Sequence, residues 1–150
     1  MHKAIFKIVI FLLLAQCGYT TVYKNTQDDD IKIVITNFKG DKEFNNKLNS
    51  ALREYFNTNT KNEFKIDVSS ELTRKIISKD AKGKVANFEL EATTTFNIKH
   101  NQKDFSITLN ELLNVENVDD SFKQKKYETI IKRNFAESMK EKLILKLNTL

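Results

Sequence analysis

The sequence is poor in the residue types from which enzyme active sites are usually built. Its 150 residues include one cysteine, two histidines and three glycines. One histidine, His2, lies in an N-terminal segment that we expect to be removed, which leaves only His100. These numbers exclude a zinc site of several His and Cys ligands and a glycine-rich phosphate loop. The composition therefore favours a protein that is not an enzyme and that holds no cofactor.

Carboxylates are the catalytic residue type that the sequence still offers. Glu89 and Glu91 alternate along an expected strand, which is more typical of a solvated sheet face than of a catalytic pair. His100 lies in an Asn-rich turn, where we expect no catalytic function for it. An enzyme acting through surface carboxylates stays open as an alternative, which a buried pair with raised pKa values in a cleft would support.

The N-terminus has the pattern of a secretory signal. Lys3 and Lys7 begin it, and the apolar run 8–15 and the single cysteine, Cys17, complete it. The tetrad Leu14-Ala15-Gln16-Cys17 resembles a bacterial lipobox, in which the cysteine receives a diacylglycerol and becomes the new N-terminus. We therefore expect a lipoprotein signal peptide over residues 1–16.

Two other interpretations of this segment compete with the lipobox. Gln16 stands where lipoboxes usually have Gly, Ala or Ser, so an ordinary signal peptide with an incidental cysteine is one of them. An uncleaved membrane anchor is the other, but the apolar run is far shorter than the roughly 20 residues that a spanning helix needs.

The expected mature chain is large enough for one domain. Removal of residues 1–16 leaves 134 residues and lowers the net charge from +5 to +3. No second cysteine remains for a disulfide, so packing alone must stabilise the fold. A mildly basic, lysine-rich surface suits anionic partners such as phosphorylated lipids.

Hydrophobic periodicity predicts six elements after a lipidated, flexible tether at residues 17–30. A β-branched strand at 31–36 and a turn at 37–40 precede a helix that begins at Asp41. Alternating apolar residues then predict three strands, over 64–72, 86–98 and 105–115, joined by turns at 80–83 and 100–103. From about residue 119 an amphipathic helix follows, whose expected core stripe is Tyr127, Ile130, Ile131, Phe135, Met139, Leu143 and Leu147.

These elements predict an α+β fold over residues 31–150 in the order β-α-β-β-β-α. Two helices with apolar stripes and a sheet with one apolar face can bury these surfaces only against each other. We therefore expect a two-layer domain with both helices on one face of a four-stranded, mostly antiparallel sheet. The helix after the first strand permits a parallel pair, so the sheet is expected to be mixed.

Three segments of the chain resemble the LPS-assembly lipoprotein LptE family. Cys17-Gly18-Tyr19 is similar to the family's lipidated start, and residues 82–90 are similar to its Gly-x-x-Ala-Glu-Tyr-x-Leu turn and strand. Residues 130–147 resemble its C-terminal helix. Together with element order and length, the resemblance covers essentially the whole mature chain. Departures include Asn87 where relatives usually have Glu, Phe135 after Asn rather than Met, and a tether without proline.

The resemblance implies an outer-membrane lipoprotein, anchored by lipid on its periplasmic side. Such proteins bind lipopolysaccharide (LPS), plug the LptD β-barrel and assist its assembly, and they need neither nucleic acid nor a cofactor besides the lipid on Cys17. Lysines at loop tips are candidate contacts for LPS phosphates, because ammonium groups bind phosphates without deep burial. They are Lys82, Lys84, Lys123, Lys125 and Lys126, each of which could equally be a solubilising lysine.

A different binding module stays open as the main alternative. Many envelope lipoproteins that scaffold another outer-membrane assembly or a secretion machine carry a small α/β domain on a tether. The partner, rather than the fold, distinguishes this hypothesis from LPS transport.

Overall fold

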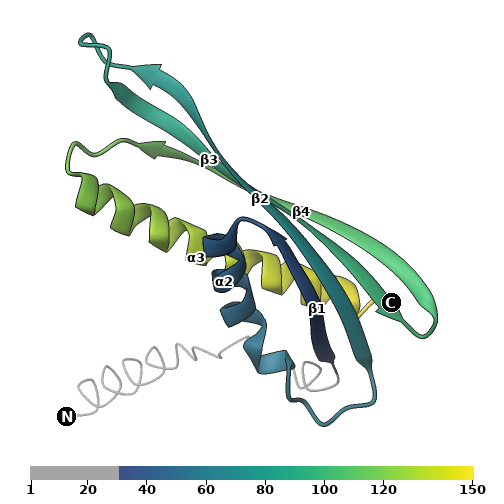
Figure 1. Cartoon of the computed structure of the whole chain (residues 1–150). Coiled ribbons are helices and arrows are strands. Elements are labelled where there is room, and N and C mark those ends of the chain that lie inside the picture. The colour runs from purple at the N-terminus through teal and green to yellow at the C-terminus, as the bar shows by residue number, and fades with distance from the viewer. Residues whose placement is uncertain (1–30) are drawn as a thin grey trace, which may run out of the picture.

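The chain from residue 31 to residue 150 follows the predicted order of elements (Figure 1). The computed structural model describes residues 31–150, so the signal peptide, Cys17 and the tether lie outside the described residues. The elements are β1 (Lys32–Gly40), α2 (Lys42–Leu52) with a following 3-10 turn (Arg53–Tyr55), β2 (Glu63–Lys79), β3 (Val85–His100), β4 (Lys103–Glu116) and α3 (Ser121–Leu147). The predicted α+β class is confirmed.

The four strands form one mixed sheet in the order β1-β2-β3-β4. Strand β1 is parallel to β2, since α2 returns the chain to the starting end of the sheet, and the other two pairs are antiparallel. The β3–β4 turn is tight, with positive φ angles at Asn101 (48°) and Gln102 (63°). This connectivity makes β2 and β3 the two central strands.

Strand β1 is longer than predicted, yet it covers only the first half of β2. The predicted turn at 37–40 is wrong: these residues stay extended because they pair with Asp67–Ser70 after a bulge at Thr36. Gly40 ends the strand with a φ of 93°, and a Cβ there would lie 1.7 Å from the Ser70 carbonyl oxygen. Beyond Ser70 the sheet therefore has three strands.

The apolar core lies between the sheet and the two helices. Phe44 and Leu48 of α2, Met139 and Leu143 of α3 and Phe96 of β3 have no exposed surface. Full burial of one such side chain stabilises the fold by roughly 1.5–3 kcal/mol. Within residues 31–150, no helix combines the length and the apolar character that crossing a bilayer requires.

Each helix begins at an aspartate that caps it. The carboxylate of Asp41 accepts a hydrogen bond from the Phe44 amide at 2.7 Å, as the sequence predicts. The cap of α3 is Asp120, whose carboxylate accepts hydrogen bonds from the amides of Phe122 and Lys123.

Two lysines of α3 join the helices at the edge of the core. The Lys132 ammonium lies 2.7 Å from Glu43, and Lys140 lies between Glu54 (3.1 Å) and Glu137 (2.9 Å). Burial acts to lower the pKa of Lys140, but hydrogen bonds to the two glutamates and their charges together raise it above its ordinary value.

The predicted core stripe of α3 is wrong in its first part. From Ile131 onward its members are buried, but Tyr127 and Ile130 are 45% and 38% exposed. In the first turns of α3, the side facing the sheet is occupied instead by Gln124, which is buried, and Glu128. Polar contacts therefore replace apolar packing in this part of the helix.

Candidate functional site

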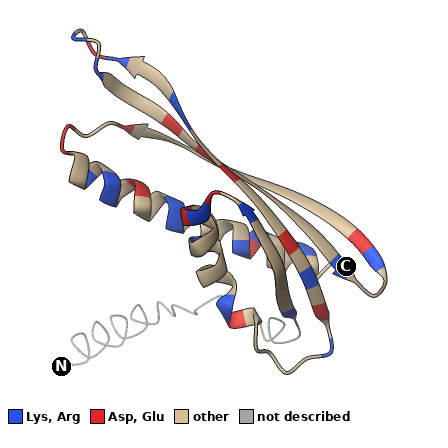
Figure 2. Ribbon diagram, viewed as in Figure 1, with Lys and Arg blue, Asp and Glu red and all other residues tan. Residues whose placement is uncertain are grey.

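All five lysines predicted to contact a ligand lie in one half of the molecule (Figure 2). We call it the distal half: it comprises residues 71–93 and 110–130, which form the three-stranded part of the sheet, the β4–α3 connection and the first turns of α3. The remainder of the described chain, with all four strands and α2, is the proximal half. Figure 1 shows the β2–β3 turn at the far tip of the distal half.

Asp80 organises the turn that carries Lys82 and Lys84. Its carboxylate accepts hydrogen bonds from both lysine amides at 2.9 Å, while its own amide donates to the Lys84 carbonyl at 2.8 Å. Gly83, with a φ of 80°, supplies the left-handed residue that the turn requires. The backbone is thus fixed, and the two ammonium groups extend from it into solvent.

The turn lies close to the start of α3. The Lys84 ammonium is 4.0 Å from the Asp119 carboxylate, and the Lys123 ammonium is 3.9 Å from the next carboxylate, Asp120. Since the two lysine side chains are 67% and 74% exposed, these ion pairs contribute little to stability. The Lys84 and Lys123 side chains can therefore turn from these carboxylates to an incoming anion at low cost, while Asp120 stays at the helix start as its cap.

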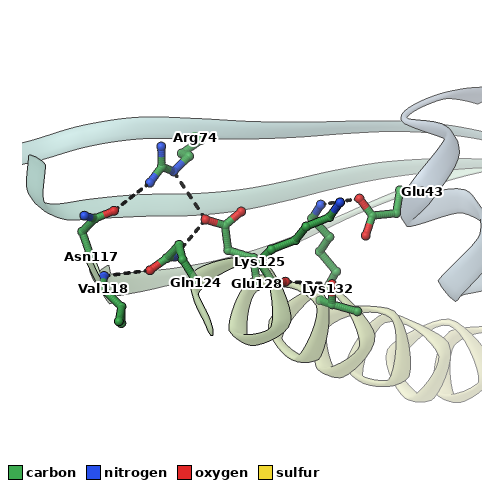
Figure 3. A network of polar contacts seen from close by, with 9 residues as sticks. Glu43, Arg74, Asn117, Val118, Gln124, Lys125, Glu128 and Lys132 are labelled. Atoms are coloured by element: carbon green, nitrogen blue, oxygen red, sulfur yellow. Dashed lines mark hydrogen bonds and ion pairs between the residues drawn. The ribbon is translucent and has the colours of Figure 1, made fainter. Parts of the chain in front are cut away.

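Lys125 and Lys126 occupy two different sides of the same helical turn. Lys125 lies seven residues before Lys132, on the same side of α3, and Figure 3 shows both lysines there with Glu43 beside Lys132. Lys126 lies four residues after Phe122, on the outward side. Lys84 and Lys123 thus lie beside the same connection, and Lys82 lies on the same turn as Lys84. Lys125 lies on a different side of α3, the side of Lys132.

A polar network holds the first turns of α3 against the sheet (Figure 3). The Gln124 side chain accepts a hydrogen bond from the Val118 amide and donates one to Glu128, both at 2.9 Å. Arg74 of β2 donates to Asn117 at 3.2 Å, lies 3.7 Å from Glu128 and stacks over the Phe88 ring at 3.8 Å. The network positions Lys123 relative to the β2–β3 turn.

This network was not predicted from the sequence. One signal was available: Arg74 interrupts the alternation of β2 at a position that faces the apolar side of the sheet, because it pairs with the buried Leu90. A cation at such a position requires a partner from the covering helix. The sequence does not show which residue of that helix provides it.

The distal half as a whole is close to neutral, with eight lysines and arginines against nine aspartates and glutamates. Its net charge therefore does not attract an anion, and anion binding must depend on the positions of individual lysines. Among residues 31–150, no group of three or more His, Cys, Asp or Glu side chains is placed to hold a metal ion.

His100 and Glu91 have structural contacts. His100 is the last residue of β3, where its ring stacks on Phe64 at 4.1 Å and its Nδ1 lies 3.0 Å from the Glu63 carbonyl oxygen. Glu91 accepts a hydrogen bond from Asn110 across the solvent-facing side of the sheet. A hollow of about 520 Å³ along β1 is lined by no ionisable side chain.

Comparisons with known proteins place the fold among bacterial lipoproteins. No protein-family model matches the chain, and no curated protein matches it in sequence. A crystal structure of rare lipoprotein B from Shewanella oneidensis is similar, with a TM-score of 0.54 and 12% identity over 73% of this chain and 91% of that one. A lipoprotein structure from Caulobacter crescentus also gives 0.54, with 15% identity over 82% of this chain and 90% of that one. The chain therefore has a fold that bacterial lipoproteins share.

Proposed function

We propose that this protein is an outer-membrane lipoprotein that binds LPS through the lysines of its distal half. In this proposal a lipid on Cys17 anchors the chain on the periplasmic side of the membrane. The protein acts as a plug and assembly partner of an LptD-type β-barrel, and it makes and breaks no bond. The fold shared with bacterial lipoproteins supports the lipoprotein part of this function.

One observation carries the LPS-binding part. Lys84 and Lys123 are 39 positions apart in the sequence, yet each pairs loosely with one of two consecutive aspartates in the β4–α3 connection. Both cations therefore lie beside the same connection, an arrangement that suits a headgroup with more than one phosphate. Their exposure matters, because an ammonium group that is already solvated loses little hydration when it binds a phosphate at the surface.

A charge-reversal experiment tests the lysines. We expect the triple variant Lys82→Glu, Lys84→Glu, Lys123→Glu to bind LPS at least about tenfold more weakly at low salt, because three attractive contacts become repulsive. The matched control reverses Lys65, Lys99 and Lys103, which are exposed near the opposite end of the sheet. Equal affinity of the two triple variants would remove the distal lysines from the site.

Affinity capture tests the partner. A C-terminally tagged chain is recovered from detergent-solubilised outer membranes, and the bound proteins are identified by mass spectrometry. A single large β-barrel at equal stoichiometry supports the plug function. Recovery with a different envelope machine supports the scaffolding alternative.

Labelling with palmitate tests the anchor. We expect label in the wild-type chain and none in a Cys17→Ser variant. Equal label in both chains would contradict lipidation at Cys17.

A further inference from the structure

Exposed apolar side chains are concentrated in the distal half. Eight of the ten large apolar residues that are exposed in the described chain lie there. Phe122, in the first turn of α3, is the most exposed of them at 77%. The eight residues are Ile76, Ile77, Leu112, Leu113, Val118, Phe122, Tyr127 and Ile130.

Three of these residues share one side of α3 with two lysines. Phe122, Lys126 and Ile130 follow one another at intervals of four residues, as do Lys123 and Tyr127, so the five side chains are neighbours on the helix surface. We call these five residues the outer α3 face. Phe122, Lys126 and Ile130 point away from the sheet, because Gln124 and Ile131, on the other side of the helix, are buried. Tyr127 lies at the border between the two sides, three residues after Gln124 and four before Ile131, and is 45% exposed.

A single exposed apolar residue needs no functional explanation. The outer α3 face differs because aromatic and aliphatic side chains alternate with cations on a helix that the Arg74–Glu128–Gln124 network holds in place. The outer α3 face itself contains two lysines and no acidic residue, although Asp119 and Asp120 precede it and the Lys123 ammonium lies 3.9 Å from Asp120. Lys126 forms no ion pair within residues 31–150, so its charge is available to a partner.

We infer that the outer α3 face docks onto the surface of an anionic phospholipid bilayer. Charge complementarity and the interleaving of apolar and basic residues point to this partner. At a bilayer surface, exposed apolar side chains reach the boundary of the acyl chains, while lysines beside them extend their ammonium groups to the phosphates. Phe122 and Ile130 enter that boundary, Tyr127 lies among the headgroups, and Lys123 and Lys126 contact phosphates. This binding requires neither LPS nor a barrel and goes beyond the proposed function.

The absence of tryptophan from the chain makes the inference directly testable. A Phe122→Trp variant of the mature chain, with Cys17→Ser to remove the acyl group, carries a single fluorescent reporter. With vesicles of phosphatidylglycerol and phosphatidylcholine, we expect its emission to move to shorter wavelength. Vesicles of phosphatidylcholine alone should bind much more weakly. Adding Lys123→Glu and Lys126→Glu should lower the partition coefficient by about tenfold or more.

Leu145→Trp provides the matched control. Leu145 is 64% exposed on the same helix, about 35 Å from Phe122 at 1.5 Å per residue. We expect its emission to stay unchanged with either vesicle. Circular dichroism shows whether each variant is folded, and Ile130→Trp replaces Phe122→Trp if the latter does not fold.

Several results would overturn the inference. They are an unchanged Phe122→Trp emission with anionic vesicles, an equal change in Leu145→Trp, and the same change with inorganic phosphate alone. An emission already at short wavelength in buffer would also overturn it, because another part of the chain or a second copy would then cover the face. Lys123 is common to both proposals, but the vesicles contain no LPS, and Lys82 and Lys84 lie outside the outer α3 face. The Phe122→Trp emission therefore tests bilayer docking alone, and the two proposals can fail separately.

Discussion

The proximal and distal halves of this domain are stabilised by different interactions. In the proximal half, α2 and the last two-thirds of α3 bury a continuous apolar core on four strands. In the distal half, three strands extend past α2, and a network of Arg74, Asn117, Gln124 and Glu128 holds the start of α3. Phe88, Leu90, Ala92 and Val115 of the distal half are buried, but most of the large apolar side chains that are exposed also lie in this half.

One half of the domain therefore mainly stabilises the fold, and the other half mainly offers side chains for binding. Apolar burial in the proximal half supplies most of the folding free energy, because dispersed polar contacts near water contribute little. The distal half can then carry exposed cations and apolar groups, whose binding partners lie outside the chain. We expect local opening to be easier in the distal half, since few buried apolar contacts oppose it.

The largest expected effect comes from removing a large side chain from the proximal core. Phe96 of β3 has no exposed surface, and Phe96→Ala should lower the free energy of unfolding by about 3–5 kcal/mol through lost burial and a cavity. Denaturant unfolding measures the change. Leu145→Ala, at an exposed position of α3, is the control and should change it by less than about 0.5 kcal/mol. A small effect at Phe96 would show that the proximal half does not dominate stability.

Breaking the distal network should have a smaller and local effect. Arg74→Met removes the contacts to Asn117 and Glu128 and should cost about 1 kcal/mol, because both members of the ion pair are partly solvated. Hydrogen exchange should become faster in residues 121–130, while the proximal half keeps its protection. Lys75→Met, at the neighbouring position on the other sheet face, is the control. Uniformly faster exchange would mean that the two halves unfold as one unit.

The smallest expected effect concerns pH and the proximal helices. Because the pKa of Lys140 is raised in the folded state, its ion pairs contribute fully below the ordinary value of 10.5 and are lost as the pH rises through the folded pKa. Thermal unfolding of the wild type between pH 9 and pH 12 should therefore show a decline above about pH 10.5. A Lys140→Met variant should show a smaller decline over the same range. An equal decline in the wild type and in Lys140→Met would exclude Lys140 as the source of the pH dependence.

Most of the fold could be predicted because each helix and strand has apolar residues at a spacing that places them along one side. The alternation from Ala86 to Ile98 predicts a strand whatever its neighbours are, and the helix between the first two strands permits their parallel pairing. The local sequence of Asn37–Gly40 predicts a turn, because its residues are extended only through pairing with Asp67–Ser70. Such a pairing cannot be inferred from the residues of the segment itself, because it depends on the neighbouring strand.

The candidate site could be predicted only as separate pieces. The lysines were identified from turn and helix-start positions, but the approach of Lys84 to Asp119 depends on the tertiary arrangement. The same holds for Arg74, whose partners Asn117 and Glu128 are more than 40 residues away in the sequence. LPS binding, the barrel partner and lipidation stay predictions.

The early end of β1 at Gly40 has a consequence for self-association. It leaves the second half of β2, from Glu71 to Lys79, with an open edge to which a strand of another molecule could add. A bulge near Ile77 interrupts the regular ladder, and Arg74, Lys75 and Lys79 place positive charges along the edge. The bulge and these charges make this stretch of β2 a poor template for an added strand, because a regular and uncharged edge is what strand addition needs.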